Sequence, residues 1–158
     1  MDPEEIIRVL RAFEAEGLEY VLIGTAAMGF HGVVRATQGF DLLIRATPEN
    51  VERLRSALRQ AYDDDPHINE ISTPDFLGEF PVVRYYPPTG DIYFDILTRL
   101  SDATNFETVD AETREIQSTR VTAATPLALF KLKKGTTRPQ DQVDAAVLQQ
   151  RFNLKDED

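Results

Sequence analysis

The sequence predicts an α+β domain in which helices pack on a mixed β-sheet, and three patterns support this. Amphipathic helical patterns begin at Pro3, Pro48 and Pro139. Two short apolar runs, 20–23 and 40–44, are typical of buried strands. A hairpin signal lies further on, where two β-prone runs flank the turn 87–90. The hairpin requires antiparallel pairing, which argues against an all-parallel sheet.

The first helix has both of its ends encoded. Asp2 can cap it, Pro3 suits the first helical position, and Glu5 completes a capping-box pattern. Its apolar stripe consists of Ile6, Ile7, Leu10 and Phe13, and Gly17 ends it. The apolar run that follows predicts a buried strand, which Gly24 stops, and a short helix should then extend to about Phe30.

The rest of the chain alternates similar elements. A second buried strand should cover 40–44, and the stripe of Val51, Leu54, Leu58 and Ala61 predicts a helix after Thr47. We expect a loop over 67–78, a hairpin of 80–86 with 92–97, a strand over 116–122, a helix from Thr125 to Gly135, and a last helix from Pro139. The segment 102–112 is polar and gives no clear pattern.

Length and composition limit the classes of protein. The 158 residues suit a single domain spanning 1–158, and the absence of cysteine excludes disulfides and thiolate sites. The chain starts with acidic residues, and its longest apolar stretch, 20–30, is shorter than the ~18 residues of a membrane span. We therefore expect a soluble cytoplasmic protein with no membrane partner.

Charge bears on possible ligands. The formal net charge of −10 disfavours a general binder of polyanions. Basic residues nevertheless gather near the C-terminus, at Lys131, Lys133, Lys134 and Arg138. This run is either a solvated helix end or the place where phosphates bind.

Two aspartates stand inside apolar strand patterns. Asp41 lies in Phe-Asp-Leu-Leu-Ile, and Asp95 lies in Ile-Tyr-Phe-Asp-Ile-Leu. An unpaired carboxylate is costly to bury, and side chains alternate along a strand, so each should face away from its apolar neighbours. Alone, each could be an ordinary exposed residue. Together they predict a shared Mg²⁺ site, because Mg²⁺ prefers oxygen ligands.

A glycine turn adds a second element of such a site. Gly24 and Thr25 end a buried strand and open a helix, an arrangement that can present backbone N–H groups to phosphate. The turn is neither a Walker A loop nor a dinucleotide-binding loop, because the further glycines and the lysine of those motifs are absent.

In combination these segments resemble the nucleotidyltransferase superfamily, which has the DNA polymerase β-like fold. The resemblance is greatest to minimal bacterial branches that include abortive-infection toxin enzymes. It rests on 21–27 and 31–44 with their glycine and strand-acid motif, on Asp95 as the later carboxylate, and on 127–132 and 138–144 as the closing helices. It runs from about Tyr20 to Leu148.

The resemblance implies an activity and a set of site residues. A nucleoside monophosphate would move from a nucleoside triphosphate to a hydroxyl on a protein, an RNA end or a small molecule. Asp41 and Asp95 would be catalytic and bind Mg²⁺, Asp95 would also orient or deprotonate the acceptor, and Gly24, Thr25 and Lys131 would bind the nucleotide. We expect Lys131 to point into the cleft and Lys133 to face solvent.

One position departs from the family pattern. Gly39 stands where the resemblance implies the first aspartate of Asp-x-Asp, the residue that would bridge two ions. The sequence therefore leaves two hypotheses: a weakened Mg²⁺-dependent enzyme, in which Gly39→Asp should raise transfer at least tenfold, or a degenerate nucleotide-binding or regulatory module. The second could be one component of a toxin–antitoxin pair, with an antitoxin as partner.

Overall fold

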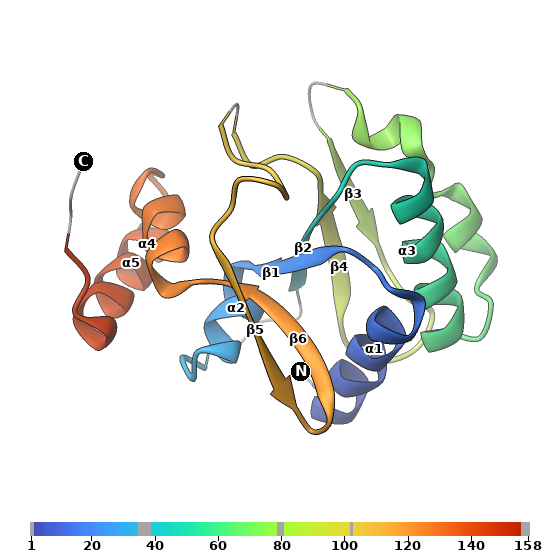
Figure 1. Ribbon diagram of the computed structural model, residues 1–158, viewed down its shortest axis with the longest axis horizontal. Helices are drawn as coiled ribbons and strands as arrows, with labels where there is room; N and C mark the ends of the chain where they lie inside the picture. The colour runs from blue at the N-terminus through green and yellow to red at the C-terminus, as the bar shows by residue number, and fades with distance from the viewer. Residues whose placement is uncertain (1, 35–38, 79–80, 102, 156–158) are drawn as a thin grey trace.

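The computed structural model describes residues 2–34, 39–78, 81–101 and 103–155, and it contains a six-stranded mixed sheet (Figure 1). The strand order is β3-β4-β2-β1-β6-β5. The β2–β4 and β1–β6 pairs are parallel, whereas β1–β2, β3–β4 and β5–β6 are antiparallel. The strands are β1 (Tyr20–Ile23), β2 (Gly39–Ile44), β3 (Val82–Tyr85), β4 (Tyr93–Leu97), β5 (Ala111–Ile116) and β6 (Thr119–Ala124).

The described residues also form five α-helices, which lie beside this sheet. In Figure 1, α1 and α3 lie together on one side of the sheet, and α4 and α5 form a helical pair at the far end of the molecule. The helices are α1 (Pro3–Glu16), α2 (Gly24–Phe30), α3 (Pro48–Ala61), α4 (Pro126–Lys134) and α5 (Pro139–Phe152). The predicted α+β class with a mixed sheet is confirmed.

Helix ends form where the sequence encodes them. The Asp2 side chain accepts a hydrogen bond from the Glu4 N–H, Thr47 caps α3 in the same way, and Thr125 caps α4. Gly17 ends α1 with a left-handed backbone, φ +68°. The predicted loop at 67–78 contains two short 3-10 helices, Pro66–Glu70 and Thr73–Phe76.

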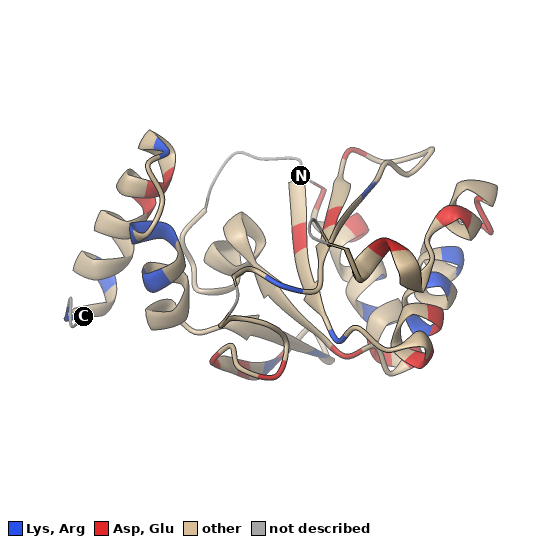
Figure 2. Ribbon diagram, turned by 90° about the horizontal axis from the view of Figure 1, so that it is seen from above, with Lys and Arg blue, Asp and Glu red and all other residues tan. Residues whose placement is uncertain are grey.

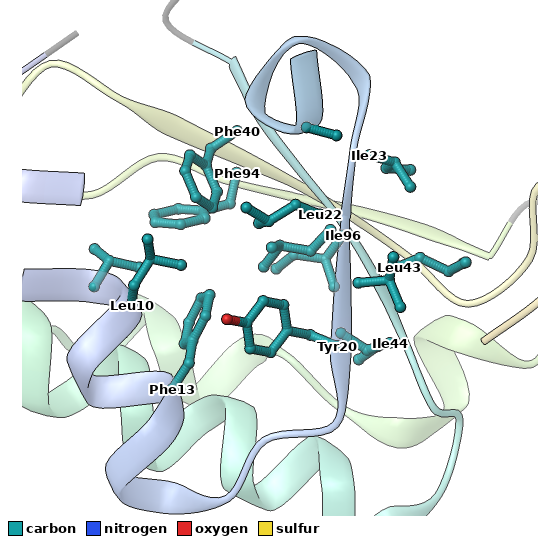
Figure 3. Close-up of a cluster of buried hydrophobic side chains, with 14 of the residues drawn as sticks. Leu10, Phe13, Tyr20, Leu22, Ile23, Phe40, Leu43, Ile44, Phe94 and Ile96 are labelled. Carbon is teal, nitrogen blue, oxygen red and sulfur yellow. The ribbon is translucent and has the colours of Figure 1, made fainter. Parts of the chain in front are cut away.

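The main core lies between the sheet and the α1–α3 layer. Figure 3 shows Leu10 and Phe13 of α1 directed at Phe40 and Phe94 from β2 and β4. The two strand phenylalanines are in edge-to-face contact, with ring centroids 5.6 Å apart. Side chains alternate along a strand, so the residue between Phe40 and Leu42 points to the other face of the sheet. That residue is Asp41 of β2.

One strand prediction is wrong. The chain does not run as a single strand over 116–122, because Gln117 and Ser118 form a tight turn with φ of +49° and +63°. The turn joins β5 to β6 in a hairpin. The residues of β5 are exposed or half-exposed at the edge of the sheet, so they carry no apolar alternation that would predict a strand. Gln117 and Ser118 have positive φ but are not glycines, so the sequence lacks the glycine that usually marks such a hairpin turn.

No helix within the described residues is long and apolar enough to cross a membrane.

The side chain of Asn50 connects three segments near the start of α3. It is fully buried, its carbonyl oxygen accepts from the Glu19 N–H at 2.8 Å, and its amide donates to the carbonyl oxygens of Glu19 and Arg45, both at 2.9 Å. Asn50 thereby fixes the residue before β1 against the residue after β2, and so helps to set the register between those strands.

Asn50→Ala should lower the free energy of unfolding by about 2–4 kcal/mol, because it removes three hydrogen bonds between a fully buried side chain and the backbone of Glu19 and Arg45. Chemical denaturation measures this change. Asn69→Ala, which alters an exposed asparagine bonded to Arg59, is the control and should change stability by less than about 0.5 kcal/mol. A loss no larger than that of the control would show that water replaces the Asn50 bonds.

Candidate functional site

The two strand aspartates lie side by side. Parallel pairing of β2 with β4 sets Asp41 directly opposite Asp95, and both side chains leave the sheet on the face away from α1 and α3. They line a cleft of about 490 Å³, within the usual size range of small-molecule sites. Gly24 and Thr25 also line it. The predicted grouping of these four residues in one cleft is confirmed as geometry.

Position 24 requires glycine because of its backbone conformation and because of the adjacent Asp41 side chain. Its φ is +60°, in the left-handed region, and a Cβ atom at this position would overlap the carboxylate of Asp41. The Asp41 side chain therefore lies directly against the β1–α2 turn. Any larger residue at position 24 would displace the carboxylate that the cleft is built around.

Asp41 is an acid in an unfavourable environment. Burial and then the negative charge of Asp95 raise its pKa to about 6, although Lys133, Arg84 and Arg138 act in the opposite direction. None of the described residues donates a hydrogen bond to its carboxylate. A half-buried carboxylate without a donor is suited to bind an added cation.

Asp95, in contrast, already has a cationic partner. Arg84 of β3 donates from Nε to Oδ1 at 2.6 Å and from Nη2 to Oδ2 at 3.2 Å. The guanidinium also lies 5.1 Å from the ring centre of Tyr93 and 3.4 Å from the Tyr86 hydroxyl. No local pattern in the sequence singles out Arg84, since an arginine on a strand next to a turn is common on protein surfaces.

The prediction for Lys131 is wrong as to its position. Lys131 is exposed and does not line the cleft, whereas Lys133 is buried and does. The buried side of α4 is formed by Leu129, Phe130 and Lys133. Lys133 is four residues after Leu129 and so shares its side of the helix, while Lys131 is turned roughly 160° away from that side.

Lys133 is held by two acids of α5. Its Nζ lies 2.9 Å from Oδ2 of Asp144 and 3.4 Å from Oδ1 of Asp141. Asp144 is only 1% exposed and also accepts a hydrogen bond from Gln140. From the sequence these two acids were expected only as part of the closing-helix segment 138–144. Their spacing with the buried Ala145 and Leu148 places Asp144 on the inner side of α5, a signal that could have identified it.

Gly39, the position at which the resemblance implies a further aspartate, is crowded by Tyr93. Gly39 lies opposite Tyr93 in the β2–β4 pair, and a Cβ atom on Gly39 would be 3.0 Å from the Tyr93 hydroxyl oxygen and 3.2 Å from Cζ. Such contacts are tighter than normal packing, so a larger side chain at 39 requires the tyrosine ring to shift.

The two histidines of the chain do not line this cleft. His31 is buried, with Nε2 at 2.7 Å from the carbonyl oxygen of Ala124, and it joins α2 to the end of β6. His67 is exposed beside Asp65. Arg35 and Thr37, which precede the β2 acid in the motif, lie outside the described residues.

The charges of the cleft are nearly balanced. Among the described residues, three basic side chains and four carboxylates line it, namely Arg84, Lys133, Arg138, Asp41, Asp95, Asp141 and Asp144. Figure 2 shows acidic and basic residues together on the α4–α5 pair, in contrast to the excess of acid in the whole chain. This mixed lining can accept both a cation and an anion, the combination that a metal-bound phosphate presents.

The donor set of the cleft fits one Mg²⁺ ion. Asp41 offers unshared carboxylate oxygens, and Asp95 is adjacent but bonded to Arg84. Within the described residues no group of three or more acids or histidines is arranged to hold a metal. A preformed cage is not required, because Mg²⁺ commonly takes one or two carboxylates and completes its shell with water and phosphate oxygens.

Comparison with solved structures defines the class of fold. An antigenic nucleotidyltransferase-like protein from Paracoccidioides brasiliensis aligns with a TM-score of 0.56 and 16% identity, over 91% of this chain and 74% of that one. A proposed nucleotidyltransferase from Thermotoga maritima aligns with a TM-score of 0.53 and 14% identity, over 97% and 95% of the two chains. The chain therefore has a nucleotidyltransferase-like fold.

Sequence comparison adds nothing more specific: no protein-family model matches the chain, and no curated protein does.

The raised pKa of Asp41 predicts a pH-dependent cost to stability. Its pKa is about 6 in the folded protein against 3.8 ordinarily, so the ionised carboxylate destabilises the fold above pH 6 and has no such effect below pH 4. Asp41→Asn should therefore raise the melting temperature at pH 7.5 in metal-free buffer. The gain should disappear as the pH falls from 6 to 4.

Thermal melts across this pH range, with a chelator present, measure the effect. Glu115→Gln, which removes one negative charge from exposed β5, is the control for net charge. An equal gain in melting temperature at pH 4 and pH 7.5 would contradict the assignment of the raised pKa to Asp41.

Proposed function

We propose that this protein is a Mg²⁺-dependent nucleotidyltransferase, which moves a nucleoside monophosphate from a nucleoside triphosphate to a hydroxyl acceptor. The observation that carries the proposal is the paired register of Asp41 and Asp95 in a cleft that Lys133 also lines. The nucleotidyltransferase-like fold supports it. The acceptor can be a protein, an RNA end or a small molecule.

Each residue of the cleft would have a role that follows from its position. Asp41, with Asp95 beside it, would hold Mg²⁺, which when bound neutralises phosphate charge. Gly24 and Thr25 would lie against the triphosphate, and Lys133, in place of Lys131, would offset its charge from the α4 side. Placement of the acceptor hydroxyl near Asp95 would allow this carboxylate to take the hydroxyl proton.

The proposed transfer is a single displacement at phosphorus. The acceptor oxygen forms a bond to the α-phosphorus, and the bond from that phosphorus to the bridging oxygen of the β-phosphate breaks. Pyrophosphate leaves with that electron pair, and the acceptor proton passes to Asp95 or to water. The chain contributes mainly position and electrostatic stabilisation.

A second candidate is a nucleotide-binding or regulatory module that no longer transfers. The contact of Tyr93 with Gly39 favours it, because the room for the first aspartate is taken by an aromatic ring. In that case the cleft would still bind nucleotide, and function would depend on a protein partner, such as an antitoxin in a toxin–antitoxin pair.

A label-transfer assay separates the two candidates. With each α-labelled nucleoside triphosphate, Mg²⁺, and panels of RNA and protein acceptors, the enzyme hypothesis expects slow transfer that Asp41→Asn abolishes. Gly39→Asp combined with Tyr93→Ala should exceed the natural chain by about tenfold or more, equivalent to ~1.4 kcal/mol. Gly39→Asp alone should gain less, because the ring obstructs the new carboxylate.

The outcomes are distinct. Nucleotide binding without transfer in any variant would support the binding module. Rapid transfer by the natural chain, with no gain in the double variant, would show that Gly39 does not weaken the site. Absence of nucleotide binding altogether would overturn both candidates.

The second prediction from this proposal concerns Lys133. Lys133→Met with Asp144→Asn removes the pair without leaving a buried unpaired acid, and it should weaken triphosphate binding by about tenfold, or ~1.4 kcal/mol. Lys131→Met, the matched control on the exposed side of α4, should change the affinity less than twofold. Isothermal calorimetry gives both values. Equal losses would indicate that only the summed charge of α4 matters.

A further inference from the structure

Arg84 lines the cleft and contacts the carboxylate of Asp95 directly. It lies directly opposite Asp95 in the antiparallel β3–β4 pair, so the contact is set by strand register. Its guanidinium engages both oxygens of the carboxylate. The Arg84 side chain is 52% exposed and that of Asp95 is 19% exposed, so the pair lies at the mouth of the cleft.

The guanidinium is supported on its other sides. Tyr93 lies 5.1 Å below it in a cation–π contact, and the Tyr86 hydroxyl lies 3.4 Å from Nη1. The two tyrosine rings are also in contact, with centroids 5.4 Å apart. A long arginine side chain loses conformational entropy when it is held, and the favourable energy of these contacts offsets that loss. Arg84 is thus positioned by three neighbours.

The same tyrosine connects Arg84 to the missing aspartate. Tyr93 covers Gly39 on one side and Arg84 on the other. Gly39, Tyr93 and Arg84 belong to three adjacent strands, β2, β4 and β3. The Tyr93 ring lies beside Gly39, where the resemblance implies a carboxylate. The same ring supports the Arg84 guanidinium, which contacts Asp95.

We infer that Arg84 is a resident cation of this site, which neutralises Asp95 in place of a second divalent ion and leaves Asp41 as the main ligand for a single one. Two features favour this assignment. Asp95 has both oxygens engaged by Arg84, whereas none of the described residues donates to the carboxylate of Asp41. A guanidinium this close also repels a divalent ion at Asp95.

This inference rests on the proposed function for its consequence. With a triphosphate in the cleft, the exposed N–H groups of Arg84 would face phosphate or the acceptor and supply positive charge without metal exchange. The claim about the cation site itself, however, concerns Mn²⁺ or Mg²⁺ binding to the protein without nucleotide.

The test is a titration of the protein with Mn²⁺ alone, with free Mn²⁺ measured by electron paramagnetic resonance. Arg84→Gln releases Asp95 to share the ion on Asp41 and should tighten Mn²⁺ binding at least tenfold. Asp95→Asn in the Arg84→Gln background should remove this gain. Arg84→Lys, which keeps the charge but loses the two-pronged contact, should fall between the natural chain and Arg84→Gln.

Two arginines serve as matched controls. Arg53→Gln removes an exposed arginine on α3 and should leave Mn²⁺ affinity unchanged. Arg138→Gln removes another cleft arginine that does not touch Asp95 and should raise affinity less than Arg84→Gln. Circular dichroism of each variant checks that the fold is retained.

Three results would overturn the inference: no tightening in Arg84→Gln, an equal gain in Arg138→Gln, or a gain that survives loss of the Asp95 carboxylate. The failure of the proposed function is distinguishable. If no variant binds or transfers nucleotide but Arg84→Gln gains Mn²⁺ affinity through Asp95, the assignment of Arg84 stands and the transferase proposal fails. If transfer occurs and Mn²⁺ affinity is indifferent to Arg84, only the inference fails.

Discussion

The parallel pairing of β2 with β4 is the constraint on which the candidate site depends. This register sets Asp41 beside Asp95, Gly39 beside Tyr93, and the apolar residues between them into the core. A shift by one residue would turn every side chain of one strand to the other face, burying an acid and exposing a phenylalanine. The cost of both changes means that the core and the site enforce the same register.

Charge in the cleft follows from this arrangement. Two adjacent carboxylates repel each other, and the protein limits the repulsion unequally. Asp95 is offset by a direct contact with Arg84, whereas Asp41 is left with a raised pKa and neighbouring cations at greater range. Lys133 is itself occupied by Asp141 and Asp144. Asp41 and Asp95 therefore differ in how their charge is offset, although their sequence contexts match.

The sequence predicted the parts of the fold that its apolar pattern determines. The caps, the α1 and α3 stripes, the buried strands and the β3–β4 hairpin follow from local spacing, and the apolar–acid–apolar pattern was sufficient to bring Asp41 and Asp95 together. Strand β5 was missed because an exposed edge strand needs no apolar alternation, and its partner β6 supplies the pairing.

The errors within the site have a common physical origin. A correct choice between Lys131 and Lys133 required knowing which side of α4 is buried. A lysine on the buried side also contradicts the usual preference of charged residues for solvent. Asp144 of α5 compensates for it, a contact across two helices that local spacing does not reveal. The contact of Tyr93 with Gly39 likewise depends on the pairing of β2 with β4, and the contact of Arg84 with Asp95 depends on the register of the β3–β4 hairpin, which its turn alone does not specify.

The two walls of the cleft come from different parts of the chain. The residues on the sheet side come from 23–25 and 39–100, whereas Lys133 and its acids belong to the α4–α5 pair, which packs on α2. A ligand that contacts both walls binds only when the α4–α5 pair is docked against the sheet side. By linkage, its binding free energy therefore stabilises the docked position of these helices. Weakening the attachment of α4 and α5 would accordingly reduce affinity even if every residue in contact with the ligand were unchanged.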